Sequence, residues 1–243
     1  MKNTNNIQWK HTTAEGVAIV VSILLAFWID TWWEDRKEGR LEAAYLLELQ
    51  EDFEQNKSRL EDQAAEFEGT ARSMRVLQEQ SVLEYPTMSV SELNETFSQL
   101  INMSSFFPVN RAYANMTGSG DLGIIRSRPL KNALAEYYAA AQVVVLVQNT
   151  HEMELVQIYE PYIIENLDYA AVGVSHVDDF PLPLPIEEAS ILKVLATREF
   201  RNIVIQKSVI STDLIDQFRG MLERTNNILR LLKSANREVS LES

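Results

Sequence analysis

One uncharged apolar run near the N-terminus constrains this chain more than any other feature. Residues 16–29 read GVAIVVSILLAFWI, without a charge or a proline and with a single hydroxyl. Counted on to Trp33, the run covers about 18 residues, or about 27 Å of helix, which is close to the hydrocarbon thickness of a bilayer. No comparable run follows. We therefore expect a transmembrane helix at residues 14–33, between a polar tail at 1–13 and a soluble domain at 34–243.

The residues at both ends of this run also favour a retained membrane span. Trp28, Trp32 and Trp33 lie at one end and Trp9 lies just beyond the other, as in the aromatic belts of membrane interfaces. A cleavable signal peptide would need small residues before its cut site, whereas this run ends in Trp-Ile-Asp-Thr-Trp-Trp. The alternative is the core helix of a soluble bundle.

One face of the run combines small residues with acids. Ala18, Ser22, Ala26 and Asp30 recur at every fourth position, and Glu15 precedes them by about one turn. Small residues at this spacing let two helices approach closely in lipid, and a carboxylate at the membrane edge faces protein or water. The stripe predicts a face for self-association or for another membrane protein. The alternative is that Ala and Ser are simply common in membrane helices and that Asp30 marks the interface.

The flanking basic residues orient the span only weakly. Lys2 and Lys10 precede it, and Arg36, Lys37 and Arg40 follow it, a balance that decides little by the positive-inside rule. The tail, however, carries no acid, whereas acids dilute the second flank. We expect a single-pass membrane protein with the short N-terminal tail kept inside and the large soluble domain exported.

Composition narrows the classes of function. The formal net charge of −13 argues against nucleic-acid binding, because no basic stripe is available to neutralise phosphates, and against a soluble part lying flat on anionic lipid. The absence of cysteine excludes disulfides, thiolate catalysis and cysteine-ligated metal. With only 8 glycines and 7 prolines, the chain is typical of an all-α fold.

Apolar periodicity predicts one long helix from the span to about residue 83. Its main stripe has a spacing of seven: Leu46, Phe53, Leu60, Phe67 and Met74. The companion stripe is polar in the middle, at Asn56, Gln63 and Thr70. This pattern favours a helix lying on an antiparallel bundle over a two-stranded coiled coil. If the helix continues from the span, it forms a stalk of about 75 Å.

Helix breakers divide the rest of the chain. Pro86 ends the long helix, Ser89 and Glu92 form a capping box, and Pro129 suits the first turn of another helix. The further helices are expected at residues 89–103, 110–117, 129–159 and 198–236, with short ones after Pro161 and from residue 186. Residues 170–185 hold three prolines and predict a long loop. The last helix should pack on the first.

No motif predicts an active site, a cofactor or a metal centre. His151 has Glu154 three residues on but belongs to no Glu-x-x-His or His-Glu-x-x-His motif, so we expect it at the surface. His176 with Asp178 and Asp179 offers too few ligands for a divalent ion. The glycines of residues 118–123 lack the strand and the lysine of a phosphate-binding loop and predict a helix cap and turn.

Two further stretches carry a recognisable pattern. Residues 15–53 combine an acid before the span, a Trp-x-Glu-x-Arg-Lys exit and a Tyr-Leu-x-x-Leu-x-x-Asp motif, at Glu15, Trp32 or Trp33, Glu34, Arg36, Lys37, Tyr45, Leu46, Leu49 and Asp52. Residues 112–138 hold an Ala-Tyr…Ser-Gly-x-Leu-x-x-Ile motif and then a Tyr-Tyr helix, with Met116 and Arg128-Pro129 departing from the pattern. Together with residues 198–204, these features resemble a bacterial family of single-span proteins catalogued only as a domain of unknown function. The resemblance implies a membrane-anchored helical protein and brings no known activity or site.

These observations favour a non-enzymatic sensor, scaffold or interaction protein that associates with itself or with another membrane protein. The first alternative is a sensory module that binds a small molecule between tyrosine walls, at Tyr137-Tyr138 and at Tyr159 with Tyr162. The second alternative, a hydrolytic or metal-dependent enzyme, has no motif to support it.

Overall fold

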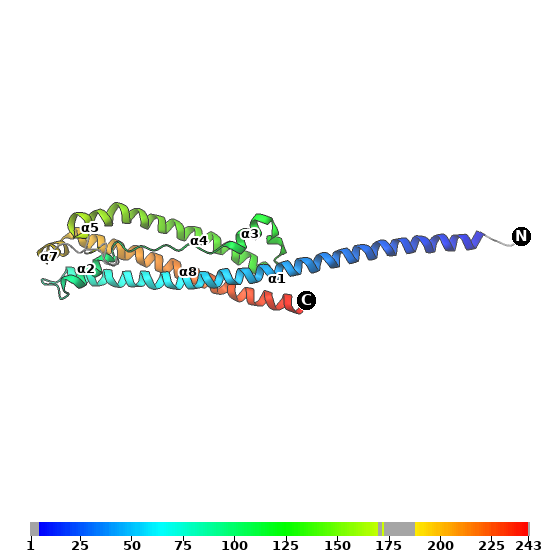
Figure 1. Cartoon of the computed structure of the whole chain (residues 1–243), viewed down its shortest axis with the longest axis horizontal. Coiled ribbons are helices and arrows are strands. Elements are labelled where there is room, and N and C mark those ends of the chain that lie inside the picture. Colours follow the sequence, from blue (N-terminus) through cyan, green and yellow to red (C-terminus); the bar gives the residue numbers. More distant parts are fainter. Residues whose placement is uncertain (1–4, 170–171, 173–187, 243) are drawn as a thin grey trace, which may run out of the picture.

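The architecture is all-α, as the sequence predicts. A computed structural model describes residues 5–169, 172 and 188–242, and all regular structure in these residues is helical (Figure 1). The elements are α1 (Asn5–Ser81), α2 (Val90–Ser98), α3 (Arg111–Ser119), η1 (Asp121–Ile124), α4 (Arg128–Glu154), η2 (Leu155–Tyr159), α5 (Glu160–Asn166), α7 (Glu188–Leu195) and α8 (Arg198–Glu242).

The first helix is one continuous element of 77 residues. Its N-terminal part projects from the bundle as a long single rod (Figure 1), and packing against the rest of the chain begins near Glu42. No proline interrupts the helix, and Gly39 costs only about 1 kcal/mol relative to alanine, so the chain can pass through it. The helix already begins at Asn5, where we expected a polar tail through residue 13.

Three long helices form the core of the bundle. Phe53 and Phe67 on α1 pack against Tyr137 and His151 on α4, so these two helices run parallel. The predicted packing of the last helix on the first is confirmed: α8 runs antiparallel to α1 along the bundle. A second apolar cluster closes the end of the bundle far from the rod, where Phe97 and Phe200 meet edge to face.

Because α1 and α4 are parallel, the chain must return along the bundle between them. Helix α2 lies at the far end, and its predicted capping box, Ser89 with Glu92, is confirmed. Residues 102–110 then run back beside α1 without regular structure, and α3 and η1 lead into α4. Gly120 ends α3 in the left-handed conformation (φ 81°), as a helix cap requires.

The helix expected at 129–159 forms, including its valine run, but its last turn is not α-helical. Helix α4 ends at Glu154, and a π-helical turn, η2, follows before α5. Pro161 lacks an N–H and its ring would clash with the carbonyl four residues earlier, which a wider turn relieves. The Glu160 N–H bonds to Leu155 O, five residues back. Apart from Val172, the proline-rich loop, with His176, Asp178 and Asp179, lies outside the described residues.

Candidate functional site

The projecting part of α1 presents the largest uncovered apolar surface of the described chain. Every large apolar side chain from Val17 to Trp33 is exposed, with Phe27 at 66%. The most apolar 18-residue window of this helix has a mean hydropathy of 1.8, and none of it is buried. Soluble monomers rarely expose contiguous apolar patches of this size. The helix is long and apolar enough to cross a membrane, and no described residue covers it as a soluble core would.

The residues predicted for membrane association all lie on this rod. Glu15, Ala18, Ser22, Ala26 and Asp30 are exposed along it. The Ser22 hydroxyl donates to Ala18 O at 2.8 Å, so it needs no external partner in a medium without water.

The predicted aromatic belt is on the same helix. Trp28, Trp32 and Trp33 are exposed at the end nearer the bundle, and Trp9 lies in the first turns. The Arg36 guanidinium lies over the Trp32 ring, 5.4 Å from its centroid.

A polar centre that the sequence did not predict lies inside the bundle, around Lys207 on α8. Its side chain is fully buried, and Nζ donates to Asn102 O at 2.9 Å. The same Nζ lies 3.0 Å from His151 Nε2 and 5.2 Å from the centroid of the Tyr159 ring. The expectation that His151 is a surface residue is wrong, since only 1% of it is exposed.

Burial sets the protonation of this centre. It lowers the pKa of Lys207 to about 7, against the opposing pull of the Glu154 carboxylate. Burial, and next the charge of Lys207, lowers the pKa of His151 to about 4, so the imidazole is neutral at pH 7. His151 Nδ1 has no hydrogen-bond partner among the described residues. Burial also raises the pKa of Tyr159, with Glu154 adding to the effect.

The π-helical turn brings Tyr159 to this centre. Tyr159 follows His151 by two α-helical turns, and the wider turn between them rotates Tyr159 inward. There the centroids of the Tyr159 and His151 rings lie 6.4 Å apart. His151 comes from α4, Tyr159 from η2 and Lys207 from α8, and the Asn102 carbonyl comes from the returning segment. The centre therefore ties these elements together. Its groups are packed directly on one another in the interior of the bundle.

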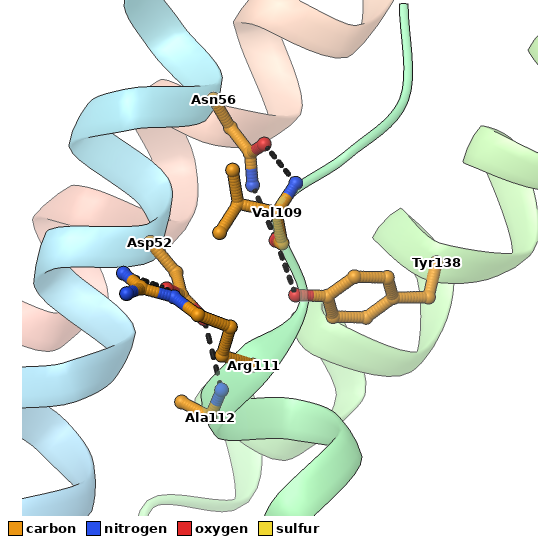
Figure 2. Close-up of polar contacts among 6 residues, drawn as sticks. All are labelled: Asp52, Asn56, Val109, Arg111, Ala112 and Tyr138. Carbon is orange, nitrogen blue, oxygen red and sulfur yellow. Dashed lines mark hydrogen bonds and ion pairs between the residues drawn. The ribbon is translucent and has the colours of Figure 1, made fainter.

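A second polar site holds the returning segment against α1 (Figure 2). The Asn56 side chain donates from Nδ2 to Val109 O at 2.9 Å and accepts from Val109 N–H at 2.7 Å, as a neighbouring strand would. Asp52 accepts from Ala112 N–H at 2.9 Å and pairs with Arg111 at 2.8 Å, and thereby caps α3, whose own N-cap residue makes no side-chain bond. Tyr138 on α4 donates to Val109 O at 3.3 Å.

Further amides repeat this pattern along the bundle. Gln148 on α4 makes the same two-bond contact with Phe106, at 2.8 and 3.0 Å. Gln63 accepts from Ser104, and Thr70 donates to Gln99. The polar middle of the companion stripe on α1 therefore bonds to the segment that runs back along it. The polar stripe is visible in the sequence, but the sequence does not show which segment of the chain bonds to it.

The tyrosines considered as walls of a ligand pocket are part of the packed bundle. Tyr137 meets Phe53 edge to face at 4.8 Å, and Tyr138 stacks on Tyr113 at 4.2 Å. Tyr162 stacks on Phe200. Among the described residues, no group of three His, Asp or Glu side chains is placed to hold a metal ion.

Comparisons with protein-family models, with curated proteins and with solved structures find no match for this chain. The family resemblance therefore remains a prediction.

Proposed function

We propose that this protein is a membrane-anchored helical bundle with a non-enzymatic role as a scaffold or sensor. One observation carries the proposal: α1 is both the uncovered apolar rod and the central helix of the bundle. An anchor joined by a flexible linker would only tether the domain. A continuous helix instead fixes the orientation of the bundle relative to the rod. A rotation or a shift of the rod therefore moves the bundle with it, and the reverse also holds.

The partner in this proposal is a second copy of the chain or another membrane protein, contacted along the small-residue stripe. Ala18, Ser22 and Ala26 offer a face on which a second helix can approach closely. Association there would turn two copies of α1 against each other, and the rigid helix would carry this change into the bundle.

Two substitutions and one control test the association face. Ser22→Leu or Ala26→Leu should weaken self-association of the full-length chain in a membrane two-hybrid assay, because the larger side chain holds the helices apart. Val20→Leu, on the other side of the helix, is the matched control and should leave the signal unchanged. Equal signals from all variants would remove the self-association role.

We further propose that the protein sits in the bacterial inner membrane with the bundle on the periplasmic side. The acid-free tail favours this orientation, whereas the flanking basic residues decide little by the positive-inside rule. Reporter fusions at the C-terminus test it: a periplasm-active phosphatase should be active there, and a cytoplasm-active fluorescent protein should be dark. The reverse pattern would place the bundle in the cytoplasm.

A further inference from the structure

We propose that the base of the rod binds the phosphate of an anionic phospholipid. This inference rests on the proposed membrane anchoring. The structure has a groove of about 410 Å³ just beyond the apolar part of α1, lined by Trp33, Arg36, Lys37, Arg40, Leu41 and Ala44. Of the described side chains that line it, three are cationic and three are apolar, a combination that suits a charged headgroup with a hydrocarbon tail attached.

The groove has a basic side because the charges on this part of α1 are sorted. At about 100° per residue, Arg36, Lys37 and Arg40 fall within about 100° of one another. The acids of the same turns, Glu34, Asp35 and Glu38, are centred on the opposite side of the helix, although Glu34 lies only about 60° from Lys37. A chain with a net charge of −13 therefore presents a locally cationic face at this level.

None of these three cations has an ion-pair partner among the described residues. Acids lie within one helical turn of each of them, yet the ion pairs found in the described chain involve Lys57, Arg111, Arg126 and Arg219. Arg36, Lys37 and Arg40 are exposed, and Arg36 is held over Trp32. Three charged groups are thus free to bind an anion.

The position along the helix matches that of lipid phosphates. The polar headgroup layer adds about 5 to 8 Å on each side of the hydrocarbon. From Trp33 to Lys37 the helix rises about 6 Å, and from Trp33 to Arg40 about 10 Å. If Trp33 lies at the edge of the hydrocarbon, Arg36 and Lys37 lie within the headgroup layer and Arg40 lies just beyond it. A free phosphate would gain nothing from Trp33, Leu41 and Ala44, whereas a lipid in contact with the apolar rod would.

The test compares lipid retained by the full-length chain. Protein reconstituted in nanodiscs of phosphatidylcholine with one quarter phosphatidylglycerol is released into mild detergent, and the bound lipids are counted by native mass spectrometry. We expect phosphatidylglycerol to be enriched over its share in the disc. The triple variant R36Q/K37Q/R40Q should lower the ratio of bound phosphatidylglycerol to bound phosphatidylcholine about tenfold or more, since each cation near an anionic surface contributes about 1 kcal/mol. The matched control E34Q/D35N/E38Q alters the opposite side and should retain it.

The outcomes separate this inference from the proposed function. A chain that enters pure phosphatidylcholine but shows no enrichment, or a triple variant that keeps it, overturns the lipid site and leaves the anchor intact. A chain that enters neither disc contradicts both. Displacement of the retained lipid by millimolar inorganic phosphate would show a general anion site and would also overturn the proposal of a lipid site.

Discussion

The Nζ atom of Lys207 lies 3.0 Å from Nε2 of His151, where α8 crosses α4 in the interior of the bundle. Two basic side chains share this buried site, and the pKa of each is lowered mainly by burial. Both cannot be protonated without placing two positive charges side by side in a medium of low dielectric. The stability of the bundle is therefore tied to pH through these two residues.

The first prediction concerns the free energy of unfolding between pH 7 and 10. The pKa of Lys207 falls from 10.5 to about 7 on folding, so in this window the unfolded chain binds the extra proton. Stability must then rise with pH, by up to about 1.4 kcal/mol per pH unit. Urea unfolding of the full-length chain in detergent, followed by circular dichroism, measures this slope. Lys207→Met should flatten it, whereas the surface change Lys57→Met should not. Parallel curves for all three proteins would contradict the buried-lysine account.

The second prediction concerns acid. The pKa of His151 falls from 6.5 to about 4 on folding, so the unfolded chain again binds more protons between these values. Stability should fall as the pH drops from about 6.5 to 4. Carboxylates titrate in the same range, so the useful quantity is the difference between wild type and His151→Phe, measured by thermal unfolding at each pH. A difference that does not change with pH would show that His151 is not buried neutral.

The third prediction concerns the amide that holds the returning segment. Asn56→Leu removes two bonds to Val109 in a buried site and leaves a backbone N–H without its partner, so we expect a loss of about 2 to 4 kcal/mol. Gln55→Leu alters the exposed neighbouring amide and should change stability by less than about 0.5 kcal/mol. Similar losses in the two variants would show that the two-bond contact contributes little. Urea unfolding measures both.

The fourth prediction separates the two partners of Asp52. Its carboxylate side chain is 1% exposed and caps α3 through Ala112 N–H, whereas the side chain of Arg111 is 66% exposed. Asp52→Ala should destabilise the protein by about 2 to 3 kcal/mol, because it leaves a buried N–H unpaired. Arg111→Ala should cost about 1 kcal/mol or less, as for an ion pair open to water. The opposite order, in the same unfolding assay, would show that the ion pair and not the cap holds α3.

Much of the fold follows from local signals in the sequence. The apolar spacing of seven, the capping box at Ser89 and the proline at 129 each act within a turn or two of helix, and each element forms where they predict it. The valine run stays helical because it lies inside a longer amphipathic pattern. Helix ends were less predictable: α2 stops at Ser98, and the following residues bond instead to side chains of α1.

The polar centre could not be predicted because its members come from distant parts of the chain. Asn102, His151 and Lys207 have no shared spacing in the sequence, and they meet because the returning segment, α4 and α8 pack together. His151 belongs to no metal-binding motif, which made a surface position the natural expectation. The π-helical turn that moves Tyr159 inward leaves no sequence signal beyond Pro161.

The most direct test of the central claim is the depth of α1 in a bilayer. The chain has no cysteine, so single cysteines can carry a spin label without changes to the background. Val20→Cys and Leu24→Cys probe the apolar rod, and Lys57→Cys probes the bundle. In vesicles, the first two labels should be accessible to oxygen and shielded from a water-soluble nickel reagent, with the third showing the reverse. If the rod labels were as accessible to nickel as the bundle label, the helix would not enter the membrane, and the account would fail.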